Sequence, residues 1–407
     1  MMRVYDLKTA KNEYRCDVII NGGGMVGLTL ALLLAQAEYK VIVLESNAKA
    51  PIVPEQAEVP TDLRVVALTQ ATRQLFEKID IWQSIAAKRL GTMENIKVWD
   101  QVLSGSILFS ALEAKEPDLG VIVEQSVILN ALRSALQHYP NVQTIYAAQL
   151  QSYQIEANRL IATTQDNNIL NAQLLVGCDG SQSWVRNFAA IGVKEKSYEQ
   201  LAIVATIQSE RPHLNTAYQR FNATGALALL PLSDPFTLSI VWSVETALGQ
   251  ALMMLSQEAF SQQLTQEVEA VLGTLTVMSK RIQFPLREQH ATSYIGERVA
   301  LVGDAAHVIH PLAGQGVNLG FLDASALADV LIQATKKHRD IGYDYVLKRY
   351  QRSRRMHNQG MIYLMRAFKE GFTHTSPLLG LLRNKGLDWV DSHAWLKQFF
   401  IQRALGK

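Results

Sequence analysis

The sequence predicts an α/β fold in which a Rossmann-like domain is intertwined with a second domain built on a mixed β-sheet, followed by C-terminal helices. Three observations carry this prediction. A βαβ pattern with closely spaced glycines occupies residues 16–45, strand-like segments precede an Asp-Gly and a Gly-Asp pair near residues 179 and 303, and the apolar pattern changes between about 195 and 285. Strands that return to one sheet from distant parts of the chain indicate a discontinuous domain.

The first βαβ unit predicts a site for a dinucleotide. Residues 17–20 are typical of a buried strand, residues 28–35 of a helix, and residues 40–44 of a second strand that ends at Glu45. Three glycines lie between the first strand and the helix: Gly22, Gly24 and Gly27. Their G-x-G-x-x-G spacing permits a tight turn, close approach of a pyrophosphate and close helix–sheet packing, and Glu45 is placed to bind the adenosine ribose. This unit alone does not distinguish NAD from FAD.

A second ligand-binding segment follows the apolar strand at residues 298–302. That strand ends at Gly303 and Asp304, and a loop rich in Pro and Gly leads into an apolar helix near Gly316. The Asp304 carboxylate suits a hydrogen bond to a sugar-like hydroxyl chain. Backbone N–H groups of the loop, at the positive end of a helix, can face an anionic ligand such as the N1–O2 region of a reduced flavin. This segment therefore favours FAD.

A third motif lies roughly midway between the other two. Residues 174–177 are typical of a strand, which enters a turn at Asp179 and Gly180, and Ser183 and Arg186 follow on a helix-like stretch. We expect Arg186 to have a structural role, linking this motif to the flavin-binding domain.

The three motifs define the expected domain organisation. The FAD-binding domain is expected to comprise residues 1–75, 100–190 and 285–345, the substrate domain residues 76–99 and 191–284, and the C-terminal helical segment residues 346–407. Within the substrate domain, residues 202–208, 226–230 and 237–244 predict strands, and a helix is expected near residues 256–272.

Composition narrows the class of protein. A chain of 407 residues that is 48% hydrophobic can bury a large core, and a net charge of +2 gives no reason to expect nucleic acid. Cys16 and Cys178 lie far apart and form no metal-binding spacing, so no metal site is expected and a reduced compartment is the simplest interpretation. Residues 1–15 are polar, unlike a signal peptide, and the longest apolar run, residues 28–35, is too short to cross a membrane. We expect a cytoplasmic protein, either soluble or peripheral on the inner face of the membrane.

The C-terminal part of the chain combines apolar and cationic residues. The basic stretch at residues 348–355 is interpreted as a solvated helix face packed on the cofactor domain. Residues 378–407 interleave Leu, Trp and Phe with Arg and Lys at helical spacing. That pattern fits a helix docked on the core, a contact in a homo-oligomer, or a contact with lipid, and these alternatives stay open.

The motifs resemble those of flavoprotein aromatic hydroxylases of the para-hydroxybenzoate hydroxylase fold. Within that group the chain is similar to the UbiH/UbiF/VisC family, the hydroxylases of ubiquinone biosynthesis. The branch signature H-P-x-A-G-Q-G-x-N-x-G-x-x-D is complete from His310 to Asp323, and the pattern D-x-R-x-x-A-L is present from Asp62 to Leu68. Two positions depart from the usual residues: Gln125, where Asn is more common, and Cys178, where Ala is usual.

The resemblance implies a function and a set of site residues. It implies an FAD-dependent monooxygenase that uses NADPH or NADH as a transient electron donor and O2 to hydroxylate a polyprenylated phenol through a C4a-hydroperoxyflavin. Pro311 would line the space between flavin and substrate ring, and Arg64 would contact the flavin or the nicotinamide, or else form a structural salt bridge. The cofactor-binding residues would be Gly22, Gly24, Gly27, Glu45, Arg64, Asp179, Asp304, Ala313, Gly314, Gln315, Gly316, Val317 and Asn318.

Two other functions stay open on the sequence. One is a flavin monooxygenase of a small soluble aromatic compound, and the other is a flavin-bound scaffold subunit of a multi-enzyme complex of ubiquinone biosynthesis. The Trp-x-Trp-x-Ile-Pro segment of flavin halogenases is absent. No base for the phenol is nominated, because Tyr218, Arg220 and His213 of the substrate domain are expected to be packing or surface residues.

Overall fold

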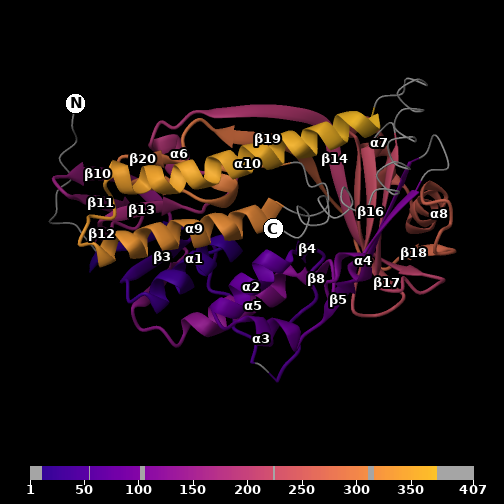
Figure 1. Cartoon of the computed structure of the whole chain (residues 1–407), viewed down its shortest axis with the longest axis horizontal. Helices are drawn as coiled ribbons and strands as arrows, with labels where there is room; N and C mark the ends of the chain where they lie inside the picture. Colours follow the sequence, from indigo (N-terminus) through magenta and orange to yellow (C-terminus); the bar gives the residue numbers. More distant parts are fainter. Residues whose placement is uncertain (1–11, 55, 101–105, 223–224, 310–315, 374–407) are drawn as a thin grey trace.

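The computed structural model describes residues 12–54, 56–100, 106–222, 225–309 and 316–373. Two regions lie side by side, one built on a parallel sheet among helices α1, α5 and α9, and the other on a large twisted sheet with α7 and α8 (Figure 1). Helix α10 (Asp344–Thr373) runs along the first region toward the second. The predicted α/β fold, with the chain crossing repeatedly between the two regions, is confirmed.

The first region contains a six-stranded sheet. Its strand order is β20-β21-β13-β2-β3-β9, and all neighbours run parallel except the edge pair β20 and β21. The strands are β2 (Val18–Asn21), β3 (Val41–Glu45), β9 (Val142–Tyr146), β13 (Leu174–Gly177), β20 (Ile295–Gly296) and β21 (Val299–Leu301). The central strands are buried along their whole length because helices cover the sheet, which explains their uninterrupted apolar sequences. The carboxyl ends of the parallel strands therefore meet at one edge.

Helices α1 (Met25–Gln36), α5 (Gln125–Leu136) and α9 (Gly316–Lys336) pack together on this sheet, and α10 packs on α9. Within the described part of the chain, α9 has the length and composition that would allow it to cross a membrane, but 56% of its apolar window is buried inside the protein. A search for the longest uninterrupted apolar run does not single out α9, because Asn318 and Asp323 lie within its apolar stretch. A core helix passes the same test, and the packing of α9 against α1 and α10 is that of a core helix.

The second region is a nine-stranded mixed sheet. The order is β22-β19-β14-β17-β16-β15-β6-β7, with β18 paired to β14, and the pairing is antiparallel except between β15 and β6. The strands are β6 (Asn95–Asp100), β7 (Ser106–Ser110), β14 (Val193–Ser209), β15 (Thr216–Asn222), β16 (Gly225–Pro231), β17 (Thr237–Glu245), β18 (Leu275–Val277), β19 (Ile282–Ala291) and β22 (His307–Val308). Helices α7 (Thr246–Met254) and α8 (Gln257–Glu267) close one face over a core that includes Trp242 and Phe260.

Two small sheets complete the fold. The order β4-β8-β5 joins β4 (Val65–Leu68), β8 (Gly120–Glu124) and β5 (Leu90–Met93), and the order β1-β12-β11-β10 joins β1 (Glu13–Arg15), β12 (Ile169–Ala172), β11 (Arg159–Thr164) and β10 (Leu150–Glu156). The remaining helices are α2 (Gln70–Lys78), α3 (Trp82–Ala86), α4 (Ala111–Ala114) and α6 (Trp184–Phe188). The first small sheet lies against the large one: a Cβ atom at Gly91 of β5 would be 1.8 Å from the Pro231 carbonyl oxygen of β16.

The structure divides residues 76–110 differently from the expected domain boundaries. Helices α2 and α3 pack in the core of the first region through Phe76, Trp82 and Ile85, although residues 76–99 were expected in the substrate domain. Conversely, β7 at residues 106–110 extends the large sheet, although residues 100–190 were expected in the FAD-binding domain. The sequence of an amphipathic helix or of a short strand shows that one face is buried. It does not show which of two neighbouring cores buries that face.

Candidate active site

The three motifs predicted from the sequence meet at one edge of the six-stranded sheet. The turn after β2 carries Gly22 and Gly24, and Gly27 lies in the first turn of α1. Strand β3 ends at Glu45, β13 leads to Asp179, and β21 leads to a 3₁₀ turn, η2 (Gly303–Ala305), that contains Asp304. Because these strands are parallel neighbours, their carboxyl ends form one crevice. Ligands of open α/β sheets bind in such a crevice.

Glycine occupies each of these three positions for a different structural reason. Gly22 has a φ of +119°, and a Cβ atom there would be 2.2 Å from the carbonyl oxygen of Cys178. A Cβ atom at Gly27 would be 2.0 Å from the carbonyl oxygen of Gly22, so only glycine lets α1 pack this close to the turn. Gly24, the N-cap of α1, has no neighbour within 4 Å of its Cβ position. The open side at Gly24 leaves room for a pyrophosphate at the N-terminus of α1.

Glu45 is held in a fixed orientation beside this turn. Its Oε2 atom accepts a hydrogen bond from the Gly23 N–H at 3.0 Å, and its Oε1 atom accepts from the backbone N–H and side-chain amide of Asn47 at 2.8 and 2.7 Å. The side chain is nearly buried. A ribose bound over the glycine turn would lie next to this carboxylate, which is the role predicted for Glu45.

The middle motif joins the other two. The Oδ2 atom of Asp179 accepts from the Asn21 amide at 2.9 Å and from the Val185 N–H at 3.1 Å, whereas its buried Oδ1 atom has no hydrogen-bond partner among the described residues. Arg186 is buried and donates to the carbonyl oxygens of Ala305 at 3.1 Å and Ser181 at 2.8 Å. The expected structural role of Arg186 is confirmed, because it ties the middle motif to the turn that holds Asp304.

Asp304 presents its carboxylate to solvent from within the fold. Its side chain is exposed, yet the surrounding protein raises the pKa of its carboxyl by desolvation. Gly303 has a φ of +62°, and a Cβ atom at Gly320 of α9 would be 3.2 Å from the Cα atom of Gly303. The first turns of α9 therefore pack directly against the turn that contains Asp304.

Four predicted site residues lie outside the described residues: Pro311, Ala313, Gly314 and Gln315. Gly316 and Val317 begin α9 and are half-buried.

The Asn318 side chain is committed to protein partners. Its Nδ2 atom donates to the Ala67 carbonyl oxygen at 2.7 Å, and its Oδ1 atom accepts from the Thr69 N–H at 3.1 Å and the Thr72 hydroxyl at 2.7 Å. Asn318 thus fixes the start of α9 against β4 and α2 rather than extending its amide toward a ligand.

Arg64 lies just before β4, at the end of the loop that follows β3. Its side chain is 63% exposed, and its Nε atom is 3.7 Å from the Oδ1 atom of Asp62. The pairing is loose enough for the side chain to reach an incoming ligand, and neither of its two proposed roles is tested by this geometry.

Sequence reasoning missed one buried polar cluster behind the Asp304 turn. The carboxylate of Asp323 accepts from His307 Nε2 at 2.5 Å, Arg354 Nε at 2.6 Å, Asn358 Nδ2 at 3.1 Å and the Gly303 N–H at 3.3 Å. Burial opposes ionisation of this carboxyl, but His307 and Arg354 outweigh it and lower its pKa to about 2.

A sequence signal for this cluster existed. Val346, Tyr350, Arg354 and Asn358 recur every four residues, which places them on one face of α10. Because Val346 and Tyr350 are apolar, that spacing predicts an inward-facing Arg354.

The residues at the crevice fit an FAD molecule. Four features are complementary to a pyrophosphate flanked by two hydroxylated chains. They are the open space at Gly24, the fixed carboxylate of Glu45, the exposed Asp304, and the Asp179 oxygen that has no partner among the described residues. When bound, FAD supplies electron transfer and oxygen activation, which the side chains cannot. The fold and this crevice define a flavin-dependent oxidoreductase.

Comparison with known proteins agrees. A family model described as "FAD binding domain" matches residues 15–364. The chain is 35% identical over 391 residues to the 3-demethoxyubiquinol 3-hydroxylase of Escherichia coli (strain K12), covering 96% of this chain and 98% of that protein. It is 32% identical to the ubiquinone hydroxylase UbiL of Rhodospirillum rubrum, covering 98% and 91%. The crystal structure of p-nitrophenol 4-monooxygenase PnpA from Pseudomonas putida DLL-E4 superposes with a TM-score of 0.77 at 18% identity, covering 97% and 98%, which supports the fold. The chain belongs to the FAD-binding family of flavoprotein monooxygenases.

Proposed function

We propose that this FAD-dependent monooxygenase hydroxylates the ring of a polyprenylated phenol in ubiquinone biosynthesis, with NADPH or NADH as electron donor. In the net reaction one atom of O2 enters the ring, the other leaves as water, and the nicotinamide is oxidised. The names of the relatives support the pathway, since both carry a ubiquinone-related hydroxylation in their names. The observation that carries the proposal is an apolar pocket between the large sheet and β4.

The pocket is lined mainly by aliphatic side chains. Small and apolar residues of the large sheet face β4 and β8 across it: Ile96, Ala217, Ala228 and Leu230. Leu68 and Met93 line the opposite side. An apolar lining favours an aromatic ring with a hydrocarbon substituent over a charged aromatic acid.

Polar groups at the pocket are few. Thr69 and Gln219 are the described lining residues that bring a polar side chain to it. Tyr218 also borders it, but the Tyr218 ring packs edge-on against Trp99 on the other face of the sheet. Gln219 can hold the phenol hydroxyl by a hydrogen bond, which would orient the ring without adding charge.

The pocket is coupled to the start of α9 and so to the flavin crevice. Asn318 binds the backbone of Ala67 and Thr69, both of which line the pocket. Hydrogen bonds thus fix this wall of the pocket to the first turn of α9, the helix that follows the residues expected at the flavin ring. A ring in this pocket would lie close to the cofactor and out of water, which limits loss of the activated oxygen.

The test is NADPH and NADH oxidation by the purified flavoprotein with and without a short-tailed 2-prenylphenol, followed by mass analysis. We expect stimulated oxidation and a product heavier by one oxygen. Filling the pocket with Ala228→Leu should suppress the product while FAD content is retained, and the exposed Ala87→Leu serves as the matched control. Stimulation by a small soluble phenol but not by the prenylphenol would overturn the substrate class. Bound FAD without turnover of either would favour the scaffold alternative.

A further inference from the structure

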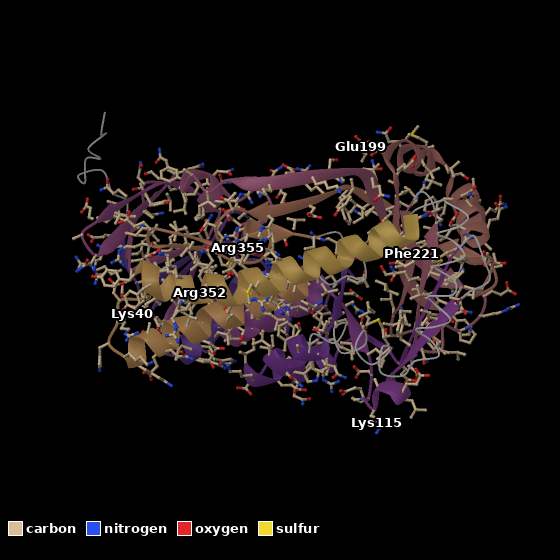
Figure 2. All side chains as sticks on the ribbon, turned by 45° about the horizontal axis from the view of Figure 1, so that its top comes forward. Lys40, Lys115, Glu199, Phe221, Arg352 and Arg355 are labelled. Atoms are coloured by element: carbon tan, nitrogen blue, oxygen red, sulfur yellow. The ribbon has the colours of Figure 1, made fainter. Side chains whose placement is uncertain are left out.

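One surface of the protein concentrates cations that the flavin site does not use. The end of α9 and the exposed side of α10 carry six cations whose side chains face solvent wholly or in part: Lys336, Lys337, Arg339, Lys348, Arg349 and Arg352. We call this surface the α9–α10 basic face. Figure 2 labels Arg352 and Arg355 along α10, and Lys40 lies at the same end of the molecule. The residue before Lys40, Tyr39, contacts α9 through a hydrogen bond between the hydroxyl groups of Tyr39 and Thr335.

Few carboxylates neutralise the α9–α10 basic face. Lys348 pairs with Asp344 at 2.6 Å, and the nearby Asp340 is taken by the inward-facing Arg298. Among the described residues, the other five cations of this face have no ion pair with a carboxylate. Since the whole chain carries a net charge of only +2, this local excess is a concentration of charge rather than an average property.

Amphipathic and apolar side chains lie among these cations. Tyr343 and Tyr345 are 44% and 46% exposed, their ring centroids are 6.0 Å apart, and the Arg339 guanidinium lies 5.6 Å from the Tyr345 ring. Farther along α10, Met356 is 79% exposed. Cations combined with tyrosine rings and an exposed apolar side chain match the interface of a bilayer, where an anionic headgroup layer covers hydrocarbon.

We propose that the α9–α10 basic face binds the surface of a membrane that contains anionic phospholipids. The occupant is a bilayer rather than a nucleic acid because the tyrosines and Met356 add apolar contact, and because residues 378–407, which follow α10, again combine Leu, Trp and Phe with Arg and Lys.

The experiment is co-sedimentation of the full-length flavoprotein with vesicles of neutral phosphatidylcholine and with vesicles that also contain phosphatidylglycerol. Tighter binding to the anionic vesicles, weakened by added salt, is expected. Each basic residue near an anionic surface contributes roughly five-fold in affinity. The triple variant Lys337→Gln, Arg349→Gln and Arg352→Gln should therefore bind roughly 100-fold more weakly.

The control is a triple variant of the same charge change elsewhere. Lys115, Arg211 and Lys280 are exposed outside this face, and changing all three to Gln should leave binding unchanged. Both variants should keep their FAD and should hydroxylate detergent-dispersed substrate like the parent, which separates membrane binding from the proposed function. Equal binding to neutral and anionic vesicles, equal binding by the two triple variants, or selective binding of duplex DNA over anionic vesicles would overturn the proposal.

Discussion

Arg354 donates its Nε–H to the Oδ1 atom of Asp323 at 2.6 Å, and the two side chains are 10% and 0% exposed. The other oxygen of Asp323 accepts from the Gly303 N–H and from His307. Helix α10 is thereby tied to the turn that holds Asp304. A buried pair of this kind adds little net stability, because desolvation offsets the attraction, but removing one partner leaves a buried charge without compensation.

The first prediction concerns this pair. Asp323→Asn should lower the free energy of unfolding by about 3–5 kcal/mol, because Arg354 would keep its charge without a carboxylate. Urea denaturation of the flavoprotein measures the change. Asp344→Asn is the matched control, since it breaks the exposed pair with Lys348 and should cost less than about 1 kcal/mol. Similar losses in the two variants would contradict a buried, coupled pair.

A second prediction concerns pH and His290. Its Nε2 atom is 3.0 Å from the Tyr294 hydroxyl, and burial, followed by the charges of His307 and Arg355, lowers its pKa from 6.5 to about 4. Between these two pH values the unfolded chain binds the proton and the folded protein does not. Stability should therefore fall as the pH drops from 6.5 to 4, by at most about 3 kcal/mol from this group.

His290→Gln tests that assignment, because Gln keeps an acceptor for the Tyr294 hydroxyl and does not titrate in this range. Denaturation curves at pH 7, 6, 5 and 4 should show a shallower loss of stability in the variant than in the parent. Parallel losses at all four values would show that other groups dominate the acid response.

The fold and the crevice could be predicted from the sequence where local geometry demands a particular residue. The tight turn predicted at Gly22 and the close helix packing predicted at Gly27 are confirmed, because neither position has room for a Cβ atom. The predicted position of Glu45 at the end of a parallel strand is confirmed, and its role at the ribose stays a prediction. The glycine spacing and the acid at the end of the second strand are local sequence patterns, so a single sequence shows them.

Long-range partners were not predictable in the same way. Arg354 lies in a basic stretch interpreted as a solvated face, and that interpretation is right for Arg352 but wrong for Arg354, whose partner is 31 residues away. Asn318 was assigned to the cofactor, whereas its side chain binds Ala67 and Thr72, about 250 positions distant in the chain. Only the tertiary fold decides which of several polar side chains on one helix meets a buried partner.

A third prediction uses two glycines that have open space at their Cβ positions. Gly24→Leu should give a folded protein that purifies without flavin, because the new side chain would occupy the cleft above the N-terminus of α1. Gly360 of α10 is equally open, so Gly360→Leu controls for bulk and should retain flavin. Visible flavin absorbance, together with the thermal unfolding temperature, distinguishes lost binding from lost folding. Full flavin retention in the Gly24 variant would remove the glycine turn from the cofactor site.

The last prediction concerns electron transfer from the nicotinamide. Arg64 is exposed and only loosely paired with Asp62, so its guanidinium is available to a transient anionic ligand. Arg64→Ala should slow flavin reduction by NADPH or NADH roughly ten-fold or more, the effect of losing one charge-assisted hydrogen bond, while FAD content stays unchanged. Arg15→Ala is the matched control, because Arg15 is also exposed and pairs loosely with Glu13 at 3.5 Å. Rapid-mixing absorbance measurements of flavin reduction would decide. Reduction kinetics unchanged in both variants would leave Arg64 as a surface salt bridge, whereas loss of FAD in the Arg64 variant would assign it to the flavin instead.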